Sequence, residues 1–111
     1  MAYRLNRELT LEMPARVPDG AGGFTESWMP LGVLWAKVTA RTGRETAGVA
    51  APLSQVAFKI IVRAAPTHSN ARPKPDQRFR DGSRYFRILS VAEDDADGRY
   101  LMCNAQEETV A

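Results

Sequence analysis

Residues 19–38, DGAGGFTESWMPLGVLWAKV, contain both tryptophans of the chain and its clearest turn and strand signals. The first five of these residues are rich in glycine, which adopts positive backbone φ angles at little cost, so we expect a turn there. Residues 24–28 then alternate between two faces, as in a strand. We expect Pro30 and Gly32 to break this strand, and residues 33–38, rich in β-branched and aromatic side chains, to form the next one. The stretch therefore predicts scaffold, with the order turn, strand, turn, strand.

Alternation of apolar and polar side chains extends over most of the chain. Four further segments show it and predict strands: residues 5–13, 56–63, 77–91 and 99–106. We expect Pro14 and Pro18 to end the first of them, and Asp81-Gly82 to turn the third into a hairpin. Six to seven short strands with little helix predict an all-β fold, a small antiparallel barrel or sandwich.

The length of 111 residues predicts one domain, residues 1–111, with two long connections. Residues 39–55 are rich in small residues and interrupted by glycine and proline, so we expect a projecting loop there. Residues 64–76 contain three prolines and few apolar side chains, which predicts an exposed, extended connection. No apolar run is long enough to span a bilayer, and no signal peptide is evident, so we expect a protein made in the cytoplasm.

Charge is distributed unevenly along the chain. Residues 41–90 hold ten basic and three acidic side chains, whereas residues 91–111 hold one basic and six acidic ones. Twelve of the fifteen basic residues are arginine, which suits bidentate and stacked contacts at interfaces. One interpretation is neutralisation within the fold. The other is head-to-tail assembly, in which the acidic end of one subunit meets the basic middle of the next.

Side chains that could act in catalysis or bind a metal ion are few and lie apart in the sequence. His68 is the only histidine and lies in the proline-rich connection, where a solvated side chain is expected. Cys103 falls within a predicted strand and is expected to be a buried structural thiol, and a single cysteine excludes an internal disulfide. Residues 94–98, DDADG, resemble the start of a calcium loop but lack its later glutamate, so a hairpin turn is the better interpretation. We therefore expect no enzyme, no metal and no cofactor.

The predicted hairpin at residues 77–91 combines arginines with aromatic side chains. Arg78, Arg80, Arg84 and Arg87 alternate with aromatic residues there, a pattern that could suit nucleic acid. The alternative interpretation is a solvated strand face or a contact between subunits, which we favour.

A series of local patterns, in this order and spacing, resembles the head–tail joining proteins of long-tailed phages, also called head-closure or stopper proteins. The patterns are RLNRELTL (residues 4–11), DGAGGFTESW (19–28), LWAKV (34–38), GRE (43–45), FKIIVR (58–63) and DGSRYFRI (81–88). The resemblance covers nearly the whole chain. The details are especially similar to the head–tail connector protein of alphaproteobacterial gene transfer agents, phage-like particles encoded in bacterial chromosomes.

This resemblance implies a small β-barrel subunit of a homo-oligomeric connector ring in a virion or phage-like particle, a hexamer with a dodecamer as the alternative. The implied partners are the adaptor or portal-side connector protein, the tail terminator protein and the packaged double-stranded DNA. In this family a long loop projects into the DNA channel and helps to retain the DNA. The matching positions lie within residues 39–55: Arg41, Gly43, Arg44, Glu45, Gly48 and Pro52.

The sequence therefore predicts a structural ring subunit that joins the DNA-filled head to the tail and helps to close the channel. The rival hypothesis is a stand-alone basic β-barrel that binds nucleic acid. The charged residues expected to contact a neighbouring subunit or DNA are Arg63, Arg78, Arg80, Arg84, Arg87, Asp94, Asp95, Glu107 and Glu108.

Overall fold

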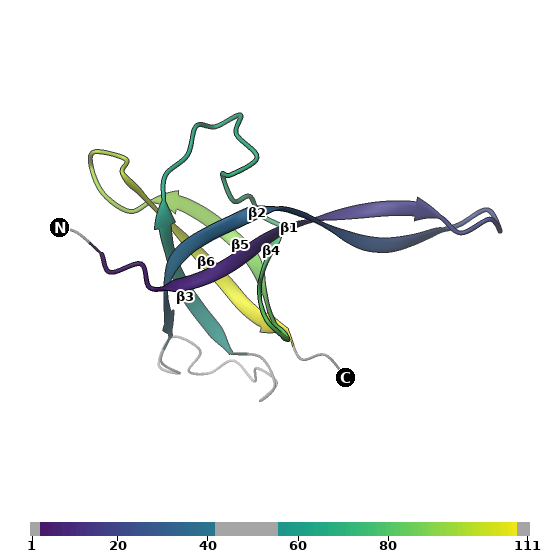
Figure 1. Ribbon diagram of the computed structural model, residues 1–111, viewed down its shortest axis with the longest axis horizontal. Helices are drawn as coiled ribbons and strands as arrows, with labels where there is room; N and C mark the ends of the chain where they lie inside the picture. The colour runs from purple at the N-terminus through teal and green to yellow at the C-terminus, as the bar shows by residue number, and fades with distance from the viewer. Residues whose placement is uncertain (1–2, 42–55, 109–111) are drawn as a thin grey trace, which may run out of the picture.

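A computed structural model describes residues 3–41 and 56–108. Within these residues the chain forms six antiparallel strands: β1 (Arg7–Pro18), β2 (Phe24–Ala40), β3 (Ala57–Arg63), β4 (Arg78–Asp81), β5 (Arg84–Glu93) and β6 (Tyr100–Glu108). The strands close into a barrel in the order β1-β2-β3-β6-β5-β4 (Figure 1). The predicted all-β class is confirmed. The strands are not uniformly short, however, because β1 has 12 residues and β2 has 17.

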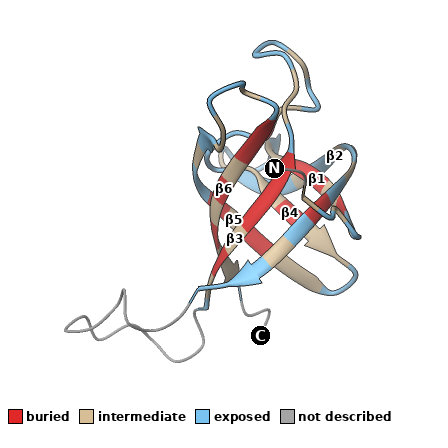
Figure 2. Ribbon diagram, turned by 90° about the vertical axis from the view of Figure 1, so that its left-hand side faces the viewer, coloured by how far each residue is buried: buried red, intermediate tan, exposed pale blue. Residues whose placement is uncertain are grey.

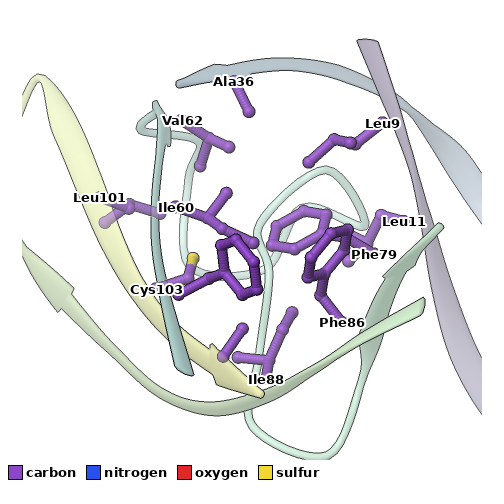
Figure 3. Close-up of a cluster of buried hydrophobic side chains, with 12 residues drawn as sticks. Leu9, Leu11, Ala36, Ile60, Val62, Phe79, Phe86, Ile88, Leu101 and Cys103 are labelled. Carbon is purple, nitrogen blue, oxygen red and sulfur yellow. The ribbon is translucent and has the colours of Figure 1, made fainter. Parts of the chain in front are cut away.

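The hydrophobic core fills the inside of the barrel (Figure 3). Because side chains alternate along a strand, every second residue points inward, and each strand contributes to the core. The largest buried side chains of this core are Phe79, Phe86, Leu9, Leu11, Ile60, Ile88 and Leu101. Phe58 and Phe86 pack edge to face with their ring centroids 5.0 Å apart. Buried positions, red in Figure 2, follow the barrel strands.

Beyond the barrel, β1 and β2 continue together as a two-stranded arm (Figure 1). β1 pairs with β4 only through Thr10–Glu12, and β2 pairs with β3 only from Ala36 onward. We call residues 13–30 the arm. Along it the two strands pair only with each other in the part of the chain that the structure describes. The arm gives the molecule its largest dimension, 52 Å.

Of the prolines and the glycine expected to end or break these strands, only Pro18 does so. Pro14 lies inside β1 opposite Trp28, and β1 ends only at Pro18. β2 runs without a break through Pro30 and Gly32, because the ladder absorbs the irregularity as a bulge opposite Leu11 and Glu12. A proline is tolerated where its missing N–H would have pointed away from the partner strand, as on the free edges of an arm. The predicted turn at Pro30 is therefore wrong.

The glycine-rich turn is present at the tip of the arm. The backbone N–H of Asp19 donates to the carbonyl of Gly23 at 3.1 Å, and Gly20 and Gly22 have φ angles of 83° and 87°. The Asp19 carboxylate accepts hydrogen bonds from the backbone N–H groups of Ala21, at 2.8 Å, and Gly23, at 3.1 Å. These two bonds lower the pKa of Asp19 below its ordinary value. The tip therefore keeps its negative charge into mildly acidic solution.

The two long connections differ in part from expectation. Thr39 and Ala40 are the last residues of β2, so the segment expected to project from residue 39 cannot start before Arg41; residues 42–55 lie outside the described residues. In the connection 64–76 most side chains are exposed, but Pro73 is fully buried.

Near the N-terminus, the Tyr3 ring packs edge to face on Tyr100 at 5.0 Å.

Candidate functional site: an arginine face and a projecting arm

The β4–β5 hairpin places Arg78, Arg80 and Arg87 on the outer surface of the barrel. Phe79 and Phe86 face each other across the hairpin and point into the core, so the residues on either side of them point outward. Gly82, with a φ of 63°, occupies the turn between the strands, as the Asp-Gly pair predicted. We call Arg78, Arg80 and Arg87 the arginine face. Arg84 does not belong to it, because it lies on the core-facing side of β5, two residues before Phe86, with its guanidinium carbon 5.7 Å from the ring of Phe58.

The first two of these arginines share one carboxylate. Glu12 accepts a hydrogen bond from Nε of Arg78 at 2.7 Å and another from Nε of Arg80 at 3.1 Å. Its side chain is only 8% exposed. The strand register explains the contact, since Glu12 lies opposite Arg78 and Thr10 lies opposite Arg80. The buried negative charge is thus matched by two positive charges, whose attraction offsets the cost of its desolvation.

Arg78 also lies between two aromatic rings. Its guanidinium carbon is 4.1 Å from the ring centroid of Trp28 on the arm and 4.1 Å from that of Tyr85 on β5. A planar guanidinium is well suited to such stacked positions. Arg87 approaches Trp28 at 5.5 Å and forms a long ion pair with Asp76 at 3.8 Å. The arginine face therefore connects the barrel to the base of the arm.

Arg84 is paired with the acidic end of the chain. Its Nε donates to Glu107 at 2.8 Å and a terminal nitrogen donates to the same carboxylate at 3.1 Å, a bidentate arrangement. The hydrogen bond lowers the pKa of Glu107 and raises that of Arg84. Arg84 also lies 5.0 Å from the ring of Phe86. Glu107 and Glu108 belong to β6, rather than forming a tail after it.

The acidic turn before β6 is held by its own hydrogen bonds. Asp95 accepts the backbone N–H groups of Arg99, at 2.8 Å, and Tyr100, at 3.2 Å. Asp94 accepts the hydroxyl of Tyr3, and this bond raises the pKa of Tyr3. The described residues contain no group of three metal-ligating side chains close enough to hold an ion. Asp94 and Asp95 therefore form hydrogen bonds within the fold.

Two further candidate residues in the described part of the chain, Arg63 and Arg41, lie apart from this cluster. Arg63 is exposed, with its guanidinium carbon 6.0 Å from the ring of Tyr100. Arg41 is exposed and donates to the side-chain oxygen of Asn104 at 2.7 Å. The other expected channel residues, Gly43, Arg44, Glu45, Gly48 and Pro52, lie outside the described residues.

The two residues tested for catalysis do not meet. Cys103 is fully buried, and burial raises the pKa of its thiol to about 12. His68 is exposed in the connection 64–76. A thiol with that pKa is protonated at neutral pH and is a poor nucleophile.

The sequence did not single out Glu12 or Trp28. Glu12 sits at an ordinary polar position of an alternating strand, and only the register between β1 and β4 shows that it faces two arginines. Trp28 and Trp35 are seven positions apart, which on a regular strand would place them on opposite faces. The bulge in β2 brings both to the outer surface. A run of like charges on one strand was the available signal that an acidic side chain should lie opposite.

Comparison with known proteins agrees with this architecture. The family of phage head completion proteins matches residues 1–108. The chain belongs to this family, so it is a structural component of the head–tail region of a phage or phage-like particle, as the sequence resemblance indicated.

Two solved structures are similar along nearly the full chain. A chain in the virion of a native gene transfer agent particle has 55% identity and a TM-score of 0.81, with 99% of this chain and 100% of that chain covered. Protein SF1141 from Shigella flexneri 2a has a TM-score of 0.65 at 18% identity, with 97% and 96% covered, and shares the fold. None of the curated proteins compared with the chain matches it. The described residues contain no helix with the length and apolar character to cross a membrane.

Proposed function

We propose that the protein is a non-enzymatic subunit of a connector ring that joins the DNA-filled head to the tail of a phage-like particle and helps to close its DNA channel. One observation carries the proposal: a chain 55% identical over its whole length belongs to the virion of a gene transfer agent. The family of phage head completion proteins supports the same place in a particle.

The shape of the molecule suits a subunit that contacts neighbours rather than a substrate. Its barrel interior is filled by side chains, and its largest projection is the two-stranded arm. Proposed neighbours are further copies of the chain, the portal-side connector protein on one side and the tail terminator protein on the other, with double-stranded DNA in the channel. A hexameric ring fits a six-fold tail, and a dodecamer is the alternative.

The channel-closing part of the proposal rests on the family resemblance of residues 39–55. Shortening this segment by deleting residues 43–51 should leave the barrel folded and the particles joined, while packaged DNA leaks. Particles of this variant that retain full-length DNA as well as the unaltered protein does would contradict this part alone.

The contacts at the arginine face give little support to the rival hypothesis, a free nucleic-acid-binding barrel. Base stacking needs open aromatic rings on a basic face. At the arginine face, Arg78 covers one side of both Trp28 and Tyr85, and Glu12 pairs with both Arg78 and Arg80. Strong, salt-dependent binding of double- or single-stranded DNA by the purified monomer would favour the rival.

The test of the main proposal uses producing cells that lack the gene. We expect separate heads and tails by electron microscopy, and joined particles once the gene is restored. Antibody against the protein should label the junction between head and tail. Normal joined particles without the gene would contradict the proposal.

A further inference from the structure

The two faces of the arm differ in character. Arg16 lies opposite Glu26 on one face, together with the prolines and Trp28. The other face has no charged side chain and is built from three directly opposed pairs: Met13 with Met29, Ala15 with Ser27, and Val17 with Thr25. We call this second surface the uncharged face.

Nothing in the described chain covers the uncharged face. Val17 is 49% exposed and Met29 is 47% exposed. Figure 1 shows the arm extending away from the barrel, with no other element beside its outer half. An isolated two-stranded ribbon is only marginally stable in water, and exposed apolar surface of this kind marks interaction sites. We therefore expect the arm to bind a partner surface.

The barrel carries a matching apolar spot on the outside of β2. Val33 is 56% exposed and Trp35 is 54% exposed, and both point outward because Ala36 points into the core. We call these two residues the β2 wall. Exposed tryptophan is a frequent energetic centre of protein interfaces.

The β2 wall has charged neighbours of both signs. Lys37 lies on the same outer face as Trp35, Lys59 pairs with Thr39 on the neighbouring strand, and Glu8 lies directly opposite Trp35 on β1. On the arm, Arg16 and Glu26 lie on the other face, so Asp19 at the tip is the charge that can meet Lys37 and Lys59. Opposite charge at a rim favours encounter in one orientation.

The two surfaces lie on opposite sides of the same sheet. The uncharged face continues the core-facing side of β1 and β2, whereas the β2 wall is on their outer side. One chain therefore cannot bring its own arm onto its own wall, but two copies can. A contact between two different surfaces is heterologous, and it generates a ring when the rotation between copies closes.

We propose that the uncharged face of the arm of one copy packs on Val33 and Trp35 of the next copy. Repeated around the assembly, this contact between neighbouring subunits closes the ring. The inference rests on the proposed function, which supplies the ring. It adds which two surfaces of the chain meet.

Cysteine cross-linking in assembled particles tests the contact. The double variant Val17→Cys/Val33→Cys should form a covalent ladder of several subunits on mild oxidation, whereas each single variant should stay monomeric in denaturing gels. The native Cys103 is buried and does not interfere. Val17→Cys/Leu89→Cys is the matched control, because Leu89 on β5 is 56% exposed, as Val33 is. It should give no ladder.

Several outcomes would overturn the inference. A dimer from Val17→Cys alone would show that arms meet each other, and a cross-link from the arm to a different protein would show that the arm reaches a neighbouring ring. If the double variant is present at the head–tail junction but forms no ladder, the inference fails while the proposed function stands. If the protein is absent from the junction, the proposed function fails and the inference fails with it.

A mixing experiment with purified protein gives a second test. Trp35→Glu should weaken self-association roughly 30-fold, the effect expected on loss of an interface centre, whereas Leu89→Glu should leave it unchanged. A heterologous contact also predicts that Trp35→Glu and Met29→Glu, each monomeric alone, form a heterodimer when mixed, because one intact arm still meets one intact wall. Failure of the mixture to pair while the unaltered protein associates would contradict the proposal.

Discussion

The guanidinium carbon of Arg78 lies 4.1 Å from the ring centroid of Trp28, so a side chain of the barrel contacts the base of the arm directly. The same guanidinium donates to the buried Glu12 of β1. Three strands thus meet around one arginine: β4 supplies it, β2 stacks on it and β1 neutralises it. The direction of the arm is fixed by this contact in addition to the continuous strands.

Replacing Arg78 with lysine should loosen the arm. Arg78→Lys keeps the charge beside Glu12 but loses the planar group between Trp28 and Tyr85, which is worth about 1 kcal/mol. We expect faster hydrogen exchange at the backbone amides of residues 24–30 and little change in β3 and β6. Arg80→Lys is the control, since Arg80 shares Glu12 but its side chain is 40% exposed. Equal exchange rates in the two variants would contradict a special role for the stack.

Glu12→Gln should destabilise the fold by about 1–3 kcal/mol, because it leaves two arginines without the carboxylate that they share. The measurement is the free energy of unfolding in urea at neutral pH. Glu8→Gln, at an exposed position of the same strand, should change it by less than about 0.5 kcal/mol. A Glu12 variant as stable as the Glu8 variant would show that the buried carboxylate contributes nothing.

The Arg84–Glu107 pair should make stability depend on pH in one direction. The folded pKa of Glu107 lies below its ordinary value of 4.5, so its contribution is fully present above about 4.5 and is lost as pH falls through the lowered value. Both side chains are partly exposed, which limits the contribution to roughly 0.2–1 kcal/mol. Unfolding of Glu107→Gln at pH 7 and at strongly acidic pH measures it. The variant should be less stable than the unaltered protein at pH 7, and the difference should vanish in acid.

A charge swap separates the internal role of Arg84 from a role at an interface. Arg84→Glu alone places two acidic groups side by side and should destabilise the barrel, whereas Arg84→Glu/Glu107→Arg should restore the pair. If Arg84 acts only within the chain, the swapped variant should yield joined particles by electron microscopy. A swapped protein that folds normally but leaves heads and tails separate would place Arg84 at an interface.

Cys103 should be unreactive in the folded protein. Its pKa of about 12 and complete burial leave almost no thiolate at pH 8, so a thiol reagent should modify it only as fast as the core opens. Modification rates with and without denaturant measure this, with an exposed Leu89→Cys variant as the positive control. Rapid reaction of Cys103 without denaturant would contradict the buried position.

Strand positions could be predicted from the sequence because burial on one face imposes a period of two. Residues such as Leu101, Cys103 and Ala105 are buried as their alternation indicated. The outer surface was harder to predict. Glu12 reaches the arginine face only because β1 pairs with β4, which is 66 residues away in sequence at the contact with Arg78. Local patterns do not contain that register.

The strand boundaries in the arm were predicted wrongly, for a different reason. Proline is expected to end a strand, since it lacks an N–H and disrupts ladders inside a sheet. In a ribbon with two free edges, half of all N–H groups point to solvent, and a proline there disrupts no bond. Pro14, Pro18 and Pro30 occupy such positions. The same residue thus has different consequences in a central strand and at an edge.

Pro14 and Pro18 also limit how the molecule can aggregate. They remove two of the outward donors along the β1 edge of the arm, whereas the β2 edge at residues 24–28 keeps its own. Growth of a cross-β fibril needs two receptive edges on every molecule, one for each neighbour. An arm with one blocked edge can pair with at most one other arm, so accidental stacking stops at two copies. We therefore expect strand addition between free subunits to give pairs of arms rather than fibrils.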